Sequence, residues 1–125
     1  MSEASPILYH YDRSPYAEKV RLLFGLLEAE WRSVTVPIQP PRETLAILAG
    51  GYRRIPVMQA GADIYCDTRL ICQELIADRP GLSGQPSPAA INLADRAESD
   101  VFFSAIRQVP MLKALIGLFS QLGLK

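Results

Sequence analysis

The feature that most constrains the fold is the polar turn Asp12-Arg13, which joins an apolar run to an amphipathic helical pattern. The run Pro6–Tyr11 predicts a strand, and the helix is expected to begin at Ser14-Pro15 and to extend to about Glu28. Serine followed by proline is typical of a helix start, because the hydroxyl accepts a backbone N–H and proline suits the first turn. Such a helix start exposes backbone N–H groups and attracts anions.

The two positions at which a disulfide oxidoreductase carries its cysteines are occupied here by Ser14 and Ala17. Thiol exchange within the chain is therefore impossible at this helix start, so a reactive thiolate must come from a ligand. A glutaredoxin-like reductase is disfavoured for the same reason. The cysteines, Cys66 and Cys72, have no third or fourth partner for a metal, so no metal site is expected and both are predicted to be buried thiols.

The alternation of strand and helix continues beyond the first helix. The expected elements are a strand over 31–36, a helix over 41–48, strands over 55–58 and 62–66, and a helix over 69–77. Pro41 suits a first helical residue, and the pair Gly50-Gly51 suits the end of that helix. The segment Gln59-Ala60-Gly61 predicts a hairpin turn, and Asp67-Thr68 predicts a helix cap. The predicted order is βαβαββα.

Charge and hydropathy exclude several classes of partner. The chain has 125 residues with 13 basic and 13 acidic side chains, and its formal net charge is +0. The basic residues are scattered among acids rather than gathered in a stripe, so no nucleic-acid partner is expected. No apolar stretch reaches the roughly 18 residues of a membrane span and no signal-peptide pattern opens the chain, so we expect no membrane partner and predict a cytoplasmic location.

A turn-rich stretch over 80–88 separates residues 1–82 from a helical part over 87–125. A long helix is predicted from Ser87-Pro88 to about Val109, where Pro110 breaks it before a strongly apolar helix over 111–122. The apolar faces of these helices need the first domain, a second subunit or further helices to cover them. We predict a homodimer on this basis.

Three motifs in order resemble those of the glutathione transferase family, over about residues 7–80. They are Ser14-Pro15-Tyr16-Ala17-Glu18-Lys19-Val20-Arg21, Arg54-Ile55-Pro56-Val57 and Asp67-Thr68. The resemblance implies a thioredoxin-like βαβαββα domain over 1–82, followed by a short all-α segment over 87–125 that begins a helical domain and is truncated relative to the family's.

The same resemblance implies roles for individual residues. Ser14 contacts the glutathione sulfur, and a cis Pro56 lets the backbone of Ile55 pair with the cysteinyl amides. Asp67 and Thr68 hold the γ-glutamyl end. Arg54 either meets the glycyl carboxylate or is a solvated charge. Tyr9 and Tyr11 are rivals for the sulfur contact, because another branch of the family uses a tyrosine near the end of the first strand, and Tyr11 is the alternative that we weigh against Ser14.

Physical chemistry supports these roles. Ser14 is too weak a base to deprotonate a thiol, so its suitable role is to donate a hydrogen bond to a thiolate beside the helix start. Thr68 offers a hydroxyl and an N–H for a carboxylate, and Asp67 offers a negative charge for an α-ammonium group. Together Asp67 and Thr68 suit the zwitterionic end of glutathione.

Two hypotheses of function follow. The first is an enzyme of the glutathione transferase type, with glutathione as co-substrate, in which the thiolate attacks an unidentified electrophile held mainly by the helical part. The alternative is a non-catalytic glutathione-binding or protein-interaction module with the transferase fold. The short helical part favours this alternative, whereas Ser14 and the pair Asp67-Thr68 favour retained ligand binding.

Overall fold

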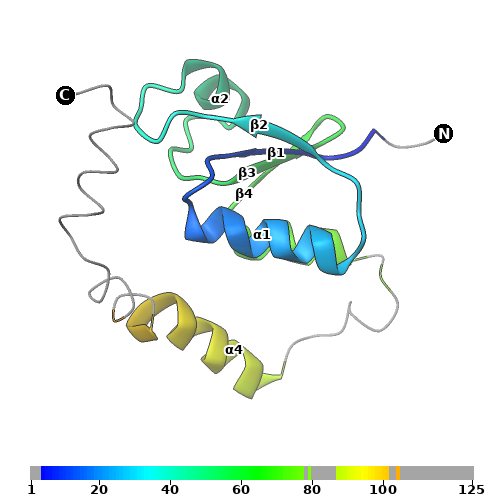
Figure 1. Ribbon diagram of the computed structural model, residues 1–125, viewed down its shortest axis with the longest axis vertical. Coiled ribbons are helices and arrows are strands. Elements are labelled where there is room, and N and C mark those ends of the chain that lie inside the picture. Colours follow the sequence, from blue (N-terminus) through cyan, green and yellow to red (C-terminus); the bar gives the residue numbers. More distant parts are fainter. Residues whose placement is uncertain (1–3, 78, 80–86, 102–103, 105–125) are drawn as a thin grey trace. The chain divides into compact units, whose positions relative to one another are not determined.

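The structure is a computed structural model that describes residues 4–77, 79, 87–101 and 104. The elements of the first unit are β1 (Ile7–His10), α1 (Pro15–Leu26), β2 (Arg32–Thr35), α2 (Glu43–Leu48), β3 (Val57–Ala60), β4 (Asp63–Cys66) and α3 (Thr68–Ile76). The predicted order βαβαββα is therefore confirmed, and each predicted element has its counterpart (Figure 1).

The four strands form one mixed sheet in the order β2-β1-β3-β4. β1 runs parallel to β2 and antiparallel to β3, and β3 runs antiparallel to β4. The parallel pair needs a crossover, which α1 supplies, whereas the antiparallel pair is joined by a tight turn. This is the thioredoxin-like architecture that the sequence predicts.

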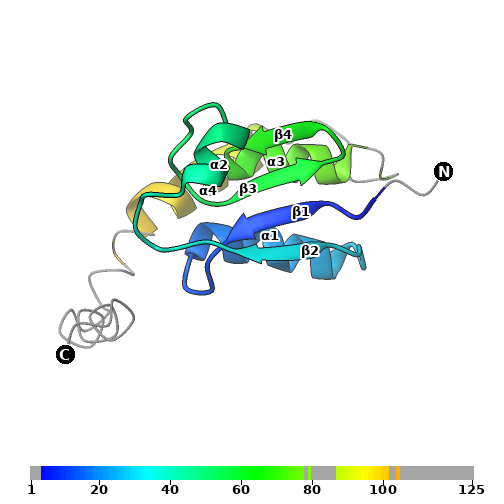
Figure 2. The same ribbon diagram turned by 90° about the horizontal axis from the view of Figure 1, so that it is seen from above.

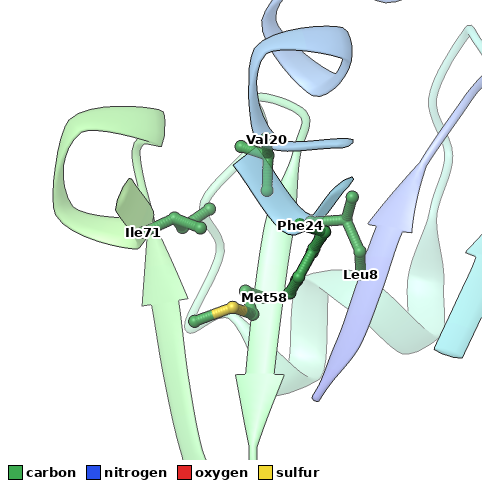
Figure 3. Close-up of a cluster of buried hydrophobic side chains, with 5 residues drawn as sticks. All are labelled: Leu8, Val20, Phe24, Met58 and Ile71. Atoms are coloured by element: carbon green, nitrogen blue, oxygen red, sulfur yellow. The ribbon is translucent and has the colours of Figure 1, made fainter. Parts of the chain in front are cut away.

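Helices cover both faces of the sheet, with α1 and α3 on one face and α2 on the other. Figure 1 shows α1 and α2 on opposite sides of the sheet. Side chains alternate between the faces along each strand, so Leu8 of β1 and its partner Met58 of β3 point to the same side. Figure 3 shows these two side chains meeting Val20 and Phe24 of α1 and Ile71 of α3. All five are almost fully buried, and this cluster is the main core of the unit.

A second cluster lies on the opposite face of the sheet. Leu45 of α2 packs there with Val57 of β3 and Val36, which follows β2. Half-buried side chains at the ends of several elements surround them, and these include Tyr11, Tyr52, Ile55 and Cys66. The sheet therefore has one cluster of buried side chains on the face covered by α1 and α3 and another on the face covered by α2.

The β3–β4 turn is shorter than predicted. Gln59 and Ala60, predicted to belong to the turn, pair with Ile64 and Asp63, so the connection is Gly61-Ala62. Gly61 has φ of 60°, which a glycine adopts without steric cost. The strand also begins later than predicted, at Val57, because Ile55 and Pro56 lie outside the ladder.

The helix α2 begins two residues later than predicted. Pro41 is not its first residue, because the helix starts at Glu43 with Arg42 at the N-cap position. The Pro40–Pro41 peptide bond is cis, and both prolines belong to the loop before the helix. The predicted end is confirmed, since Gly50 and Gly51 both have positive φ and follow the last turn.

The chain divides into two compact units, residues 1–83 and 84–125. In the second unit α4 (Pro88–Arg96) begins as predicted, with the Ser87 hydroxyl accepting the Ala90 N–H at 3.2 Å. The α-helix does not continue unbroken toward Val109 as predicted, because a π-helical turn, η1 (Ala97–Val101), follows it. The predicted end of that helix and the helix over 111–122 lie outside the described residues. No described helix is both long and apolar enough to cross a membrane.

Candidate functional site

Three chain segments that carry predicted site residues meet at one edge of the sheet. Because β1 and β3 are antiparallel, the carboxyl end of β1 lies beside the amino end of β3. The amino end of β3 in turn lies beside the carboxyl end of β4 (Figure 2). Ser14 follows β1, Pro56 precedes β3 and Asp67 follows β4, so the topology brings these three positions to the same edge.

Ser14 is the N-cap of α1, as predicted. Its Oγ accepts the Ala17 N–H at 3.1 Å, and its own N–H donates to the Tyr11 carbonyl at 3.1 Å. The hydroxyl therefore acts as an acceptor, and its hydrogen has no acceptor among the residues that the structure describes. Ser14 is only 2% exposed, so a ligand can reach no more than the tip of its side chain.

The segment before β3 has the backbone geometry that the family resemblance implies. The Ile55–Pro56 peptide bond is cis, Pro56 is buried and Ile55 is half-buried. Arg54 is exposed and forms no ion pair with any described residue. The structure thus places the Ile55 backbone at the sheet edge and leaves the Arg54 charge free to meet solvent or an anion.

The start of α3 is held by Asp67, which is the predicted cap. Its Oδ1 accepts the Arg69 N–H at 2.8 Å, and Thr68 is the first helical residue, one position earlier than predicted. Thr68 is 8% exposed. Asp67 has φ of 77° and ψ of 128°, in the half of backbone space that residues with a Cβ rarely adopt. Such strained residues cluster at functional sites, because the fold must force them into place.

Tyr52 is a neighbour of this site that the sequence reasoning did not select. Its hydroxyl lies close enough to Asp67 and Cys66 for both to influence its pKa. Burial, then Asp67 and then Cys66 raise the pKa of Tyr52, whereas Arg54 and the Asp67 backbone lower it. Tyr52 therefore remains a neutral hydroxyl at ordinary pH. Tyr52 is identified as a neighbour of the site only by its position beside Asp67, and the local sequence gives no signal of that contact.

The two tyrosines near the end of β1 differ in their availability. The Tyr9 hydroxyl donates to Gln59 Oε1 at 2.8 Å, so it is engaged across the sheet. Tyr11 is half-buried and packs against the α2-face cluster around Leu45 and Val57. Tyr11 thus lies next to the turn that leads into Ser14, and its place as the alternative sulfur contact stays a prediction.

Both cysteines are free, and they are half-buried rather than buried as predicted. Burial raises the pKa of the Cys66 thiol, which lowers its thiolate fraction. Cys66 is therefore a poor nucleophile, although it directly precedes Asp67. Among the described residues no group of three histidine, cysteine or acidic side chains could hold a metal ion.

Arg42 ties the loop before α2 to the segment before Pro56. Its guanidinium donates to the carbonyls of Pro37 at 2.6 Å and Arg53 at 3.2 Å, and also to that of Ile38. A hollow of about 250 Å³ lies beside it, lined by Pro40, Pro41, Arg42, Glu43, Leu45, Ala46, Tyr52 and Arg53. None of the site residues predicted from the sequence lines this hollow, but Tyr52, the neighbour of Asp67, does.

Comparison with known proteins gives a consistent result. Residues 8–84 match the family model described as glutathione S-transferase, N-terminal domain. A GST-like protein from Pseudomonas syringae is 40% identical with a TM-score of 0.73, over 87% of this chain and 41% of that one. No curated protein matches the chain.

Two further solved structures are similar. A glutathione S-transferase from Methylobacillus flagellatus, with GSH bound, is 25% identical with a TM-score of 0.58, over 74% of this chain and 46% of that one. A trimeric glutathione transferase from Leishmania is 15% identical with a TM-score of 0.60, over 71% and 20% of the two chains, and this similarity shows the fold alone. The present chain matches less than half the length of each of the three structures.

Proposed function

Because the chain belongs to the glutathione S-transferase family, we propose that it binds reduced glutathione at the sheet edge that carries Ser14, Pro56 and Asp67. The observation that carries the proposal is the convergence of these three positions, which lie 42 and 11 residues apart in the sequence, at one edge. The GSH bound to the Methylobacillus protein supports glutathione as the ligand.

Ser14 is proposed to donate its hydroxyl hydrogen to the glutathione sulfur. The N-terminus of α1 adds a favourable potential of roughly 0.3–2 kcal/mol, and a charge-assisted hydrogen bond adds roughly 1.5–3 kcal/mol. Each unit of thiol pKa requires about 1.4 kcal/mol, so the two effects together suffice to lower a thiol from about 8.5 toward neutrality. Ser14 therefore stabilises the thiolate without acting as a base.

The other end of glutathione is proposed to lie at the start of α3. The Asp67 carboxylate attracts the α-ammonium group, and the Thr68 N–H and hydroxyl bind the α-carboxylate. The backbone of Ile55, next to the cis Pro56, pairs with the cysteinyl amides, and Arg54 attracts the glycyl carboxylate. Tyr52, close to Asp67, adds a neutral hydroxyl to the same subsite.

The reaction proposed is attack of the bound thiolate on an electrophile held mainly by the helical part of the protein. A second candidate is a glutathione-binding module without turnover. In either case we propose a homodimer in the cytoplasm, with no nucleic-acid or membrane partner and no metal. Light scattering of the purified protein measures the oligomeric state.

The titration of the bound thiol tests the role of Ser14. The ultraviolet absorbance of the thiolate is followed against pH with glutathione bound to the wild type and to Ser14→Ala. We expect the thiol pKa to lie well below about 8.5 in the wild type and to rise by about one unit or more in the variant. Equal thiol pKa values in the two proteins would remove Ser14 from the mechanism.

A further inference from the structure

The Arg21 side chain is folded against the turn that leads from β1 into α1. Its Nη2 donates to the Asp12 carbonyl at 2.9 Å, and its Nη1 donates to the Tyr11 carbonyl at 3.4 Å. The Tyr11 carbonyl is the same one that accepts the Ser14 N–H. The Arg21 side chain is therefore mostly covered, with only 18% of it exposed.

Glu18 fixes the outer side of the Arg21 guanidinium. Glu18 lies one turn before Arg21 on α1, and its Oε2 accepts hydrogen bonds from Arg21 Nε at 2.8 Å and Nη2 at 2.5 Å. An exposed ion pair of this kind contributes little stability by itself. The ion pair does orient the planar guanidinium, so that Nη1 faces His10.

His10 contacts the inner side of the same guanidinium. Its Nδ1 lies 2.8 Å from Arg21 Nη1, and its Nε2 lies 2.6 Å from Ser33 Oγ on β2. A guanidinium can only donate, so Nδ1 must accept and the proton of the neutral ring must be on Nε2, where it donates to Ser33. His10 is 4% exposed and meets Trp31 edge to face at 5.5 Å.

The surroundings of His10 oppose a second proton on the ring. Burial and then the Arg21 charge from α1 lower the pKa of His10, whereas Asp12 in the turn raises it slightly. A protonated ring would lose the acceptor that Arg21 uses and would place two cations within hydrogen-bonding distance. Arg21 and the ring are therefore compatible only while His10 is neutral.

We propose that Arg21 is a positioning residue that fixes the Tyr11–Ser14 turn, and that neutral His10 holds Arg21 in place, so that protonation of His10 releases the Ser14 hydroxyl from its binding geometry. The link to ligand binding rests on the proposed function. The role of Arg21 in fixing the turn is independent of the proposed function, because it is a property of the unliganded protein.

Two amides report directly on the turn. The Ser14 N–H donates to the Tyr11 carbonyl and the Ala17 N–H donates to the Ser14 hydroxyl, so loosening the turn speeds the hydrogen exchange of both. The test compares Arg21→Met with Arg32→Met, since Arg32 also donates to a backbone carbonyl, that of Ser5, from an exposed site on β2. Hydrogen exchange and calorimetric titration with reduced glutathione are measured for both variants.

We expect Arg21→Met to speed exchange at Ser14 and Ala17 by about tenfold or more and to weaken glutathione binding by a similar factor. Exchange in β3 and β4 remains unchanged, and Arg32→Met behaves as the wild type. If the Ser14 and Ala17 amides of Arg21→Met exchange as slowly as those of the wild type, the inference is overturned, whatever the protein binds. Accelerated exchange in Arg21→Met, together with a wild type that binds no glutathione, would instead overturn the proposed function and leave the fixing of the turn supported.

His10→Asn provides a second variant in case Arg21→Met fails to fold. The asparagine oxygen can replace Nδ1 as the acceptor for Arg21, but it cannot take up a proton. As the pH falls from 7.5 through the lowered pKa of His10, exchange at Ser14 should accelerate, relative to the intrinsic rate, in the wild type and not in the variant. His10 is the single histidine of the chain, so its nitrogen shifts also read the tautomer without ambiguity. A neutral ring with its proton on Nδ1, or the same pH dependence in both proteins, would refute the role of His10.

Discussion

Asp67 shows, at the scale of one residue, a conflict between local stability and the proposed site. Its carboxylate caps α3, which is favourable, but its backbone has positive φ, which is unfavourable for any residue with a Cβ. A residue selected for stability alone at this position would be glycine, which keeps most of the cap stability and removes the strain. The carboxylate is therefore best explained by the α-ammonium group that we propose it binds.

Substitutions of Asp67 separate these effects. Asp67→Ala loses the cap and keeps the strain, so we expect the free energy of unfolding to fall by about 1–2 kcal/mol. Asp67→Gly should stay within about 1 kcal/mol of the wild type, because relief of strain offsets the lost cap. Both variants should bind glutathione more weakly. Urea denaturation measures the stabilities, and an alanine variant as stable as the glycine variant would contradict the argument from strain.

His10 gives the fold a dependence on pH whose sign is fixed by its depressed pKa. The unfolded chain binds a proton at His10 below about pH 6.5, whereas the folded chain resists it until lower pH. The contribution of neutral His10 is thus complete above about pH 6.5 and is lost as the pH falls through the pKa of the folded state. Denaturation midpoints measured from pH 7.5 to pH 5 should fall in the wild type and stay level in His10→Asn. If the wild-type midpoint also stays level, burial does not oppose the protonation of His10.

The residues that sequence reasoning identified and those that it missed differ in the range of their contacts. Ser14 and Asp67 cap the helix that follows them, so the local sequence is enough to predict both. Arg21, Arg42 and Tyr52 act on groups ten or more residues away, and nothing in their own neighbourhood marks these contacts. The local pattern therefore predicts the caps of the site but not the side chains that support it.

At the scale of elements, periodicity predicted the order of strands and helices because each element buries one regular face. The errors lie where periodicity carries no information. Pro41 lies in the loop before α2, and the β3–β4 turn needs only Gly61-Ala62. The change from α4 to a π-helical turn at Ala97 has no signal in the sequence that we can identify.

The helix α1 supplies a direct test of the main core. Phe24 is fully buried and stacks on Trp31 at 5.2 Å, whereas Leu26, two residues later, is 76% exposed. We expect Phe24→Ala to lower the free energy of unfolding by about 3–5 kcal/mol and Leu26→Ala to change it by less than about 0.5 kcal/mol. Chemical denaturation of the two variants checks this difference. Similar losses in both would mean that α1 is packed differently from the structure described.

At the scale of the whole molecule, the fold acts mainly by bringing distant segments to one edge. The mixed pairing of β1, β3 and β4 places one helix start and one cis proline beside a second helix start. The chain also resembles the Pseudomonas protein over 87% of its length. The convergence, rather than any one residue, supports glutathione as the ligand.

Calorimetric titration with reduced glutathione tests the proposed site most directly, when the wild type is compared with Ser14→Ala and with an Asp67→Ala, Thr68→Ala double variant. We expect micromolar to millimolar binding by the wild type, weaker binding by Ser14→Ala and loss of binding by the double variant. Wild-type affinity in the double variant, or no binding by the folded wild type, would contradict the central claim that this sheet edge is a glutathione site.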